Sequence, residues 1–253
     1  MLYIEGAAGI SGDMTVGALL SLGASQERLK AVLDSLKLGD EFSYVISEKA
    51  SYGIAGTDFD VILPHRHHHH EHGHHHHHHH EHRNLADVEA VIDRGEMSDR
   101  ARSLAKKAFR FVAEAEAKAH GKPLDEVHFH EVGAIDSIVD IVSAAVLFDD
   151  LGETECVVAG LAEGSGTVMC AHGELPVPVP AVLNIAAATG VPLRVSDVKG
   201  ECVTPTGIAL AAAFRTREAL PAAYRVKGVG IGLGKRDYGR PAILRIMKIE
   251  AAE

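Results

Sequence analysis

Apolar residues along the chain alternate between the two-residue repeat of β-strands and the three- to four-residue repeat of α-helices. Strands are expected at residues 2–5, 41–48, 57–63, 155–159, 193–196, 224–232 and 242–249. Helices are expected after the glycine-rich turn at 6–13, over 25–36, after the capping residues Asn84 and Ser98, from Ile135, and over 180–189 and 207–213. The interleaved elements predict an α/β protein with a mixed sheet packed with helices.

One segment breaks this pattern. Fourteen of the 18 histidines lie in residues 65–82, interrupted only by Arg66, Glu71, Gly73 and Glu81. Such a segment cannot bury apolar surface, so we expect a disordered His-rich insertion (65–83) between an amino-terminal part (1–64) and the remainder of the domain (84–253). A purification tag is disfavoured, because the segment is internal and contains Glu and Gly.

Imidazole is the commonest side-chain ligand for borderline metal ions, and it suits nickel, zinc, copper and cobalt alike. The segment therefore predicts a reservoir or delivery arm for a transition metal, without naming the metal. Its candidate ligands are His67, His68, His69, His70, His72, His74, His75, His76, His77, His78, His79 and His80.

Composition narrows the class of protein. The 253 residues are 46% hydrophobic and 24% charged, which is ordinary for a globular protein, and the net charge of -10 disfavours nucleic acid and anionic membranes as partners. Three widely spaced cysteines fit neither a disulfide framework nor paired metal knuckles, so we expect a cytoplasmic protein. Neither a signal peptide nor an apolar run long enough to span a membrane is visible.

The sharpest chemical motif is the sequence VHFHEVGAIDSIVD at 127–140. In an extended segment His128 and His130 would project to the same side, next to Glu131. Asp136 and Asp140 are four residues apart on what we expect to be the outer face of a helix. Together these residues could hold a divalent metal or act in acid–base chemistry; alternatively, Asp136 only caps the helix and Asp140 is solvated.

The opening loop is a weaker candidate. Gly9, Ser11 and Gly12 lie between a strand and a helix, where backbone N–H groups can approach a ligand, and we assign them as candidate cofactor-binding residues. The spacing does not match the dinucleotide fingerprint, and the lysine of a phosphate-binding loop is missing. Asp13 would repel a phosphate and is better suited to a metal ion or an amine.

Two further motifs lie in the second half of the chain. His172 precedes a glycine and the alternating prolines of 176–180, which suit a rigid wall beside a pocket. Thr204 and Thr206 flank a proline before a helix, so one can cap the helix while the other faces a ligand oxygen. The alternate glycines of 228–234 predict a bare strand face against another backbone or a flat ligand.

Taken together, GISGDM at 9–14, the histidine arm, the motif at 127–142, HGELPVPVPA at 172–181 and TPTG at 204–207 resemble one family in the same order. It is the family of LarC-type nickel insertion proteins of the nickel-pincer (lactate racemase) cofactor pathway. The resemblance implies a CTP-dependent nickel cyclometallase of the lyase class, supported by Mg or Mn. Such an enzyme inserts nickel into pyridinium-3,5-bisthiocarboxylic acid mononucleotide and releases CMP and diphosphate.

The resemblance also implies partners and roles. Full-length members carry a further carboxy-terminal domain associated with CTP binding, whereas this sequence stops at Glu253, so it resembles the amino-terminal, nickel-binding part. We expect a homo-oligomer, a carboxy-terminal CTP-binding domain or chain as partner, and an apo lactate racemase-type client. The expected catalytic residues are Asp13, His128, His130, Glu131, Asp136 and His172, with His128 and His130 also as metal ligands.

Two other functions stay open at this point. The chain could be a nickel storage or chaperone protein without catalytic activity, in which case the motif at 127–142 would be structural. It could also be a metal-dependent hydrolase that uses the His and Asp cluster, although no substrate is indicated.

Overall fold

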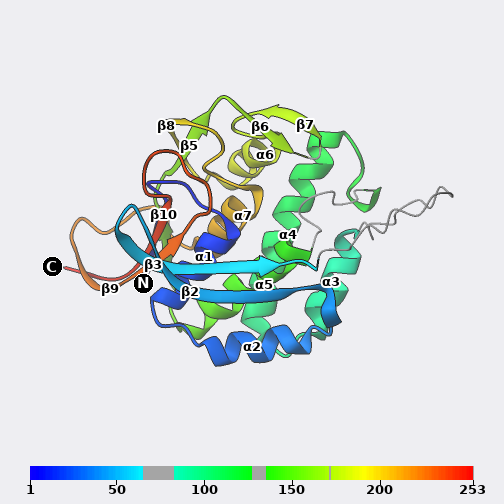
Figure 1. Cartoon of the computed structure of the whole chain (residues 1–253), viewed down its shortest axis with the longest axis horizontal. Coiled ribbons are helices and arrows are strands. Elements are labelled where there is room, and N and C mark those ends of the chain that lie inside the picture. Colours follow the sequence, from blue (N-terminus) through cyan, green and yellow to red (C-terminus); the bar gives the residue numbers. More distant parts are fainter. Residues whose placement is uncertain (65–82, 127–134, 171, 253) are drawn as a thin grey trace.

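The computed structural model describes residues 1–64, 83–126, 135–170 and 172–252. The histidine arm and the residues His128, His130 and Glu131 therefore lie outside the described residues. Within the described part, helices pack on a mixed sheet, which confirms the predicted fold class (Figure 1).

The main sheet has six strands in the order β2-β3-β9-β10-β1-β4. Its strands are β1 (Leu2–Glu5), β2 (Ser43–Ser51), β3 (Ile54–Ile62), β4 (Cys156–Val158), β9 (Tyr224–Leu233) and β10 (Ile243–Ala251). Strand β1 pairs antiparallel with β10 and parallel with β4, and β3 meets β9 in parallel. Residues on both sides of the histidine arm thus belong to one sheet.

The remaining strands form two small sheets of two strands each. One pairs β5 (Leu161–Ser165) with β8 (Leu193–Lys199), and the other pairs β6 (Thr167–Cys170) with β7 (Gly173–Pro176). The sequence pattern did not predict β5, β6 or β7. These strands are short, and Gly164, Gly166 and Gly173 interrupt any alternation of apolar and polar residues. Leu175, Val179 and Pro180 form part of a cavity wall, so one of the three prolines of the segment at 176–180 lines the cavity.

Most predicted helices are confirmed within two or three residues. The seven α-helices of the described residues are α1 (Gly12–Ser21), α2 (Gln26–Ser35), α3 (Leu85–Arg94), α4 (Asp99–His120), α5 (Ile135–Asp150), α6 (Pro180–Thr189) and α7 (Pro205–Phe214). Asn84 caps α3 in a reciprocal capping box with Asp87, and Ser98 accepts the backbone N–H of Ala101 at the start of α4. Helix α4 ends at Gly121, which is in the left-handed conformation.

The helices build the core in layers (Figure 1). Helix α1 packs directly on β9 and β3, α5 packs against α1, and α4 contacts α5, α6 and α7. The rings of Phe148 and Phe214 stack in this interior with centroids 4.1 Å apart. None of the helices in the described ranges is long and apolar enough to cross a membrane.

The glycines of β9 explain how α1 approaches the sheet. A Cβ on Gly230 would lie 2.0 Å from the carbonyl oxygen of Ala18, and one on Gly232 would lie 1.9 Å from that of Met14. The bare strand face therefore lies against another backbone, which is the first of the two alternatives that the glycine pattern left open. This close packing fixes the position of α1 and of the opening loop that precedes it.

Candidate functional site

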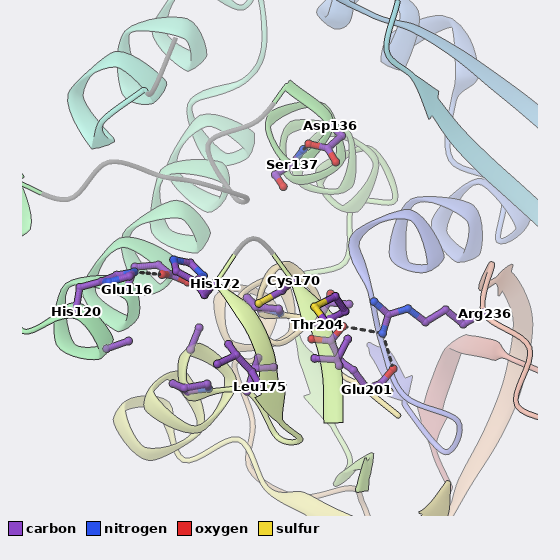
Figure 2. A pocket seen from close by; sticks show the side chains of 17 residues that line it. Glu116, His120, Asp136, Ser137, Cys170, His172, Leu175, Glu201, Thr204 and Arg236 are labelled. Atoms are coloured by element: carbon purple, nitrogen blue, oxygen red, sulfur yellow. Dashed lines mark hydrogen bonds and ion pairs between the residues drawn. The ribbon is translucent and has the colours of Figure 1, made fainter. Parts of the chain in front are cut away.

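A cavity of about 620 Å³ lies between the end of α4, the start of α5, the β6–β7 hairpin and the start of α7. This volume is in the range of small-molecule sites. In the view of Figure 2, Glu116, His120 and His172 lie at one end and Glu201 and Arg236 at the other. Other polar residues of the wall are Asp136, Ser137, Cys170 and Thr204.

The structure brings only some of the sequence-predicted residues to this cavity. Asp136, His172 and Thr204 line it, whereas Asp13 and Thr206 do not. Gly9, Ser11 and Gly12 of the opening loop do not line it either. Asp136 belongs to the same motif as His128, His130 and Glu131, which lie outside the described residues.

Backbone hydrogen bonds join the opening loop to the TPTG segment, whose Thr204 and Pro205 line the cavity. The backbone N–H of Ile10 donates to the carbonyl of Cys202 at 2.9 Å, and the N–H of Thr204 donates to the carbonyl of Ile10 at 3.0 Å. Gly9 has a φ of 94° and leaves no space for a Cβ, which would lie 2.1 Å from the Cys202 oxygen. Two motifs far apart in sequence are therefore held together by backbone contacts.

The polar side chains of these two motifs mainly cap helices. The Ser11 hydroxyl accepts the N–H of Met14 at the start of α1, and the Thr204 hydroxyl accepts the N–H of Gly207 at 3.1 Å at the start of α7. The hydroxyl of Thr206 lies 3.0 Å from that of Thr204. Thr204 is thus the capping residue of the pair, and it also faces the cavity.

Glu163 of β5 holds the segment before Thr204 in place. Its Oε1 accepts three backbone N–H groups, from Gly164 at 2.7 Å, Cys202 at 2.8 Å and Val203 at 3.2 Å. Burial raises the pKa of this carboxyl, and the backbone donors partly oppose that shift. Glu163 could not be recognised from the sequence, because a single Glu in a short strand belongs to no motif.

Asp140 does not lie on an outer face of α5, so that expectation and the alternative of a solvated side chain were wrong. Its carboxylate packs against Gly12, where a Cβ would lie 2.5 Å from Oδ2, and it accepts the backbone N–H of Asp13. Its Oδ1 is buried without a hydrogen-bond partner. Burial raises the pKa of Asp140 well above its ordinary value, and the charges of Asp13 and Asp136 raise it further.

Lys235 supplies the positive charge on this side. Its Nζ lies 3.7 Å from Oδ2 of Asp13 and also pairs with Asp60. Asp13 is thus next to the ammonium group of Lys235, and its role toward a bound metal ion or amine stays a prediction.

Replacing Asp140 by Asn should stabilise the protein at neutral pH. The pKa of Asp140 is higher in the folded than in the unfolded state, so its contribution to stability is present below the unfolded pKa and is lost as pH rises through the folded pKa. Denaturant titrations from about pH 4 to about pH 8 should show the advantage of Asp140→Asn growing with pH. A constant difference, or one that grows toward acid, would contradict this assignment.

Two histidines meet at one end of the cavity. The ring centroids of His120, the last residue of α4, and His172, in the β6–β7 turn, are 4.9 Å apart. Oε2 of Glu116, one helical turn before His120, lies 3.4 Å from His120 Nε2. His120 and Glu116 were not predicted from the sequence. Their four-residue spacing at a helix end was the available signal, but such spacing is common on helix surfaces.

At the other end of the cavity, Arg236 pairs with the buried Glu201 at 2.8 Å and donates to the Glu201 carbonyl at 3.1 Å. Within the described ranges, no three His, Cys, Asp or Glu side chains are close enough to hold a metal ion together. Burial raises the pKa of Cys156 to about 12 and that of Cys202 to about 11, so neither thiol is a ready ligand.

Comparison with known proteins decides the family. The profile of a family described as "Nickel insertion protein" matches residues 2–253. The chain belongs to this family. Residues on both sides of the histidine arm fall within the match, so the whole described fold is the fold of a nickel insertion protein.

Three relatives in this family illustrate the similarity. A "Pyridinium-3,5-bisthiocarboxylic acid mononucleotide nickel insertion protein" of Alkaliphilus metalliredigens is 52% identical over 98% of this chain and 60% of its own length. A protein with the same description from Acetivibrio thermocellus is 42% identical over 100% and 61%, and a "Putative nickel insertion protein" of a Geobacter species is 41% identical over 99% and 62%. No solved structure matches the chain.

The chain spans about 60% of the length of these nickel insertion proteins. What their names describe therefore applies to proteins that are longer than the chain described here.

Proposed function

We propose that this chain is the amino-terminal, nickel-binding part of an enzyme that inserts nickel into pyridinium-3,5-bisthiocarboxylic acid mononucleotide. The observation that carries the proposal is the cavity, which combines metal-ligating and proton-accepting side chains with a guanidinium in a space that suits a mononucleotide. Membership of the nickel insertion protein family, and the printed names of two relatives, support the same substrate.

The two ends of the cavity suit the two parts of such a substrate. Arg236 is a planar cation that can bind a phosphate, while His120, His172 and Glu116 can face the reacting pyridinium ring. Formation of a nickel–carbon bond displaces a ring proton, and an imidazole or carboxylate next to the ring can accept it. His172, Asp136 and Glu116 are the candidates for this role among the cavity residues, and the substrate supplies the two sulfur ligands.

The proposal also assigns roles to the histidine arm, to the residues of the motif at 127–140 and to the expected partners. The histidine arm at 65–83 would collect nickel, and His128, His130 and Glu131 would act with Asp13 in its transfer. CTP and Mg or Mn would be used by a carboxy-terminal CTP-binding domain or chain, so that the assembled enzyme is a CTP-dependent cyclometallase of the lyase class. We further propose a cytoplasmic homo-oligomer whose product matures an apo lactate racemase-type client.

The proposal predicts that nickel insertion needs both parts of the protein. The chain is mixed with nickel and the pincer mononucleotide, alone and with a family carboxy-terminal domain plus CTP and Mg, and the nickel–thiolate absorbance is followed. We expect insertion only in the complete mixture. Insertion by the chain alone would place the whole cyclometallase here.

Absence of insertion in both mixtures would instead favour a nickel storage protein. A full-length variant in which Asn replaces the arm histidines of residues 65–82 is the matched control. With ample nickel it should retain most of the insertion rate, because the arm only collects the metal. A storage protein would lose most of its nickel capacity with the same change.

A further inference from the structure

Only four histidines lie outside the arm: His120, His128, His130 and His172. His128 and His130 lie outside the described residues, and the other two are in contact although they are far apart in sequence. The end of α4 supplies one ring and the β6–β7 turn supplies the other, and both line the cavity. The fold thus places both histidines of its described part at one end of one cavity.

The surroundings of this pair favour a cation. The rings are tilted by 47°, not stacked flat, and Oε2 of Glu116 lies 3.4 Å from Nε2 of His120. His120 is at the carboxyl end of the 22-residue helix α4, where the helix dipole favours positive charge. Two imidazoles and a carboxylate are also donors that nickel accepts.

We propose that His120 and His172 bind one Ni²⁺ at the end of the cavity. Glu116, which is not placed to share an ion with both rings in the structure, would join them after its side chain rotates. This inference rests on the function proposed above. In it, the site holds nickel before the metal is transferred to the pincer ligand. Two or three protein ligands leave coordination positions open. Open positions are what a transfer site needs, because the two sulfurs and one carbon of the substrate must enter before the imidazoles leave.

Cys170 lines the same cavity but is not part of the proposed site. Its Sγ lies 3.3 Å from the carbonyl oxygen of Gly173, so the thiol hydrogen is already donated within the β6–β7 hairpin. A thiolate would also hold nickel more firmly than imidazole does, which would oppose transfer to the thiocarboxylate sulfurs. The proposed ligand set is therefore imidazole and carboxylate only.

The site can be tested directly in crystals of the full chain soaked with NiCl₂. Anomalous scattering at the nickel edge locates the metal, so nickel on the arm does not interfere. We expect a peak between the rings of His120 and His172 that disappears in His120→Gln and His172→Gln. Crystals with nickel elsewhere and none between these rings would overturn the proposal.

Equilibrium dialysis tests the site in solution by measuring the affinity for nickel. In a full-length chain whose arm histidines are replaced by Asn, His120→Gln and His172→Gln should each weaken nickel binding by about tenfold or more, equivalent to about 1.4 kcal/mol. Glu116→Gln should weaken it less. The matched control is Glu114→Gln on the same helix, because Glu114 pairs with Arg110 and does not line the cavity. An unchanged affinity in both histidine variants would overturn the proposal.

Insertion assays separate this inference from the proposed function. If the nickel site is correct, the two histidine variants should insert nickel slowly when nickel is scarce and recover partly when it is in excess, because the site sets the apparent affinity for the metal. Insertion in the complete mixture that is unchanged by these variants would leave the function standing and reject the site. Nickel between the rings without insertion in any mixture would reject the function and keep the site.

Discussion

Gly232→Ala is expected to lower the free energy of unfolding by about 3 kcal/mol or more. The added Cβ would lie 1.9 Å from the carbonyl oxygen of Met14 and 2.6 Å from the backbone nitrogen of Ala18. Both atoms belong to the backbone of α1, which cannot rotate away as a side chain could, so helix and sheet must separate. Denaturant titration followed by circular dichroism measures the loss.

Gly228→Ala is the matched control on the same strand face. Its Cβ would meet only the side-chain atom Leu22 Cδ1 at 3.2 Å and Lys248 Cβ at 4.0 Å. The flexible Leu22 side chain can move, and alanine reduces the entropy of the unfolded chain, so the stability should change by less than about 1 kcal/mol. Equal losses in the two variants would show that close packing of α1 is not the cause.

Glu163→Ala is expected to destabilise the protein by roughly 3 kcal/mol, since three buried backbone N–H groups lose their acceptor. Part of the loss is offset, because a buried carboxylate no longer has to be desolvated. Two of the three donors, Cys202 and Val203, directly precede Thr204 at the cavity. Hydrogen exchange should therefore become faster at these two amides, and denaturant titration gives the total loss.

Glu163→Gln separates the acceptor from the charge. Glutamine keeps an oxygen in the place of Oε1 and removes the charge whose burial raises the pKa of Glu163. We expect a loss of only about 1 kcal/mol and nearly unchanged exchange at Cys202 and Val203. If the two variants exchange equally fast, the carboxylate charge, and not its acceptor oxygen, holds the segment.

The elements that local chemistry specifies were predictable. Strand β1, helices α2 and α6, and the capping residues Asn84 and Ser98 all lie where the periodicity and the capping residues placed them. Of the strands in the two small sheets, β8 was predicted, whereas β5, β6 and β7 were not. Strand β5, for example, is short and depends on pairing with β8, which is not encoded in its own five residues.

The residues of the candidate site likewise divide into those that local sequence motifs predict and those that depend on tertiary contacts. His172, Asp136 and Thr204 were predicted from local motifs, and each lines the cavity. His120 and Glu163 were not, because their roles arise only when α4 meets the β6–β7 turn and when β5 meets residues 202–203. The burial of Asp140 was also hidden, since the pattern of α5 alone does not reveal that Gly12 of α1 packs against it.

The position of β1 in the sheet has a consequence for folding kinetics. Leu2, Tyr3 and Ile4 pair with residues of β10, and the backbone N–H of Ile249 donates to the Met1 carbonyl. During synthesis the first strand therefore leaves the ribosome long before its central partner exists. Pairing over such a sequence separation is slow, and the edge of β1 that faces β10 stays unpaired, and prone to aggregation, until residues 243–251 emerge. Chaperones that bind short apolar segments should accordingly engage the nascent chain through its first strand.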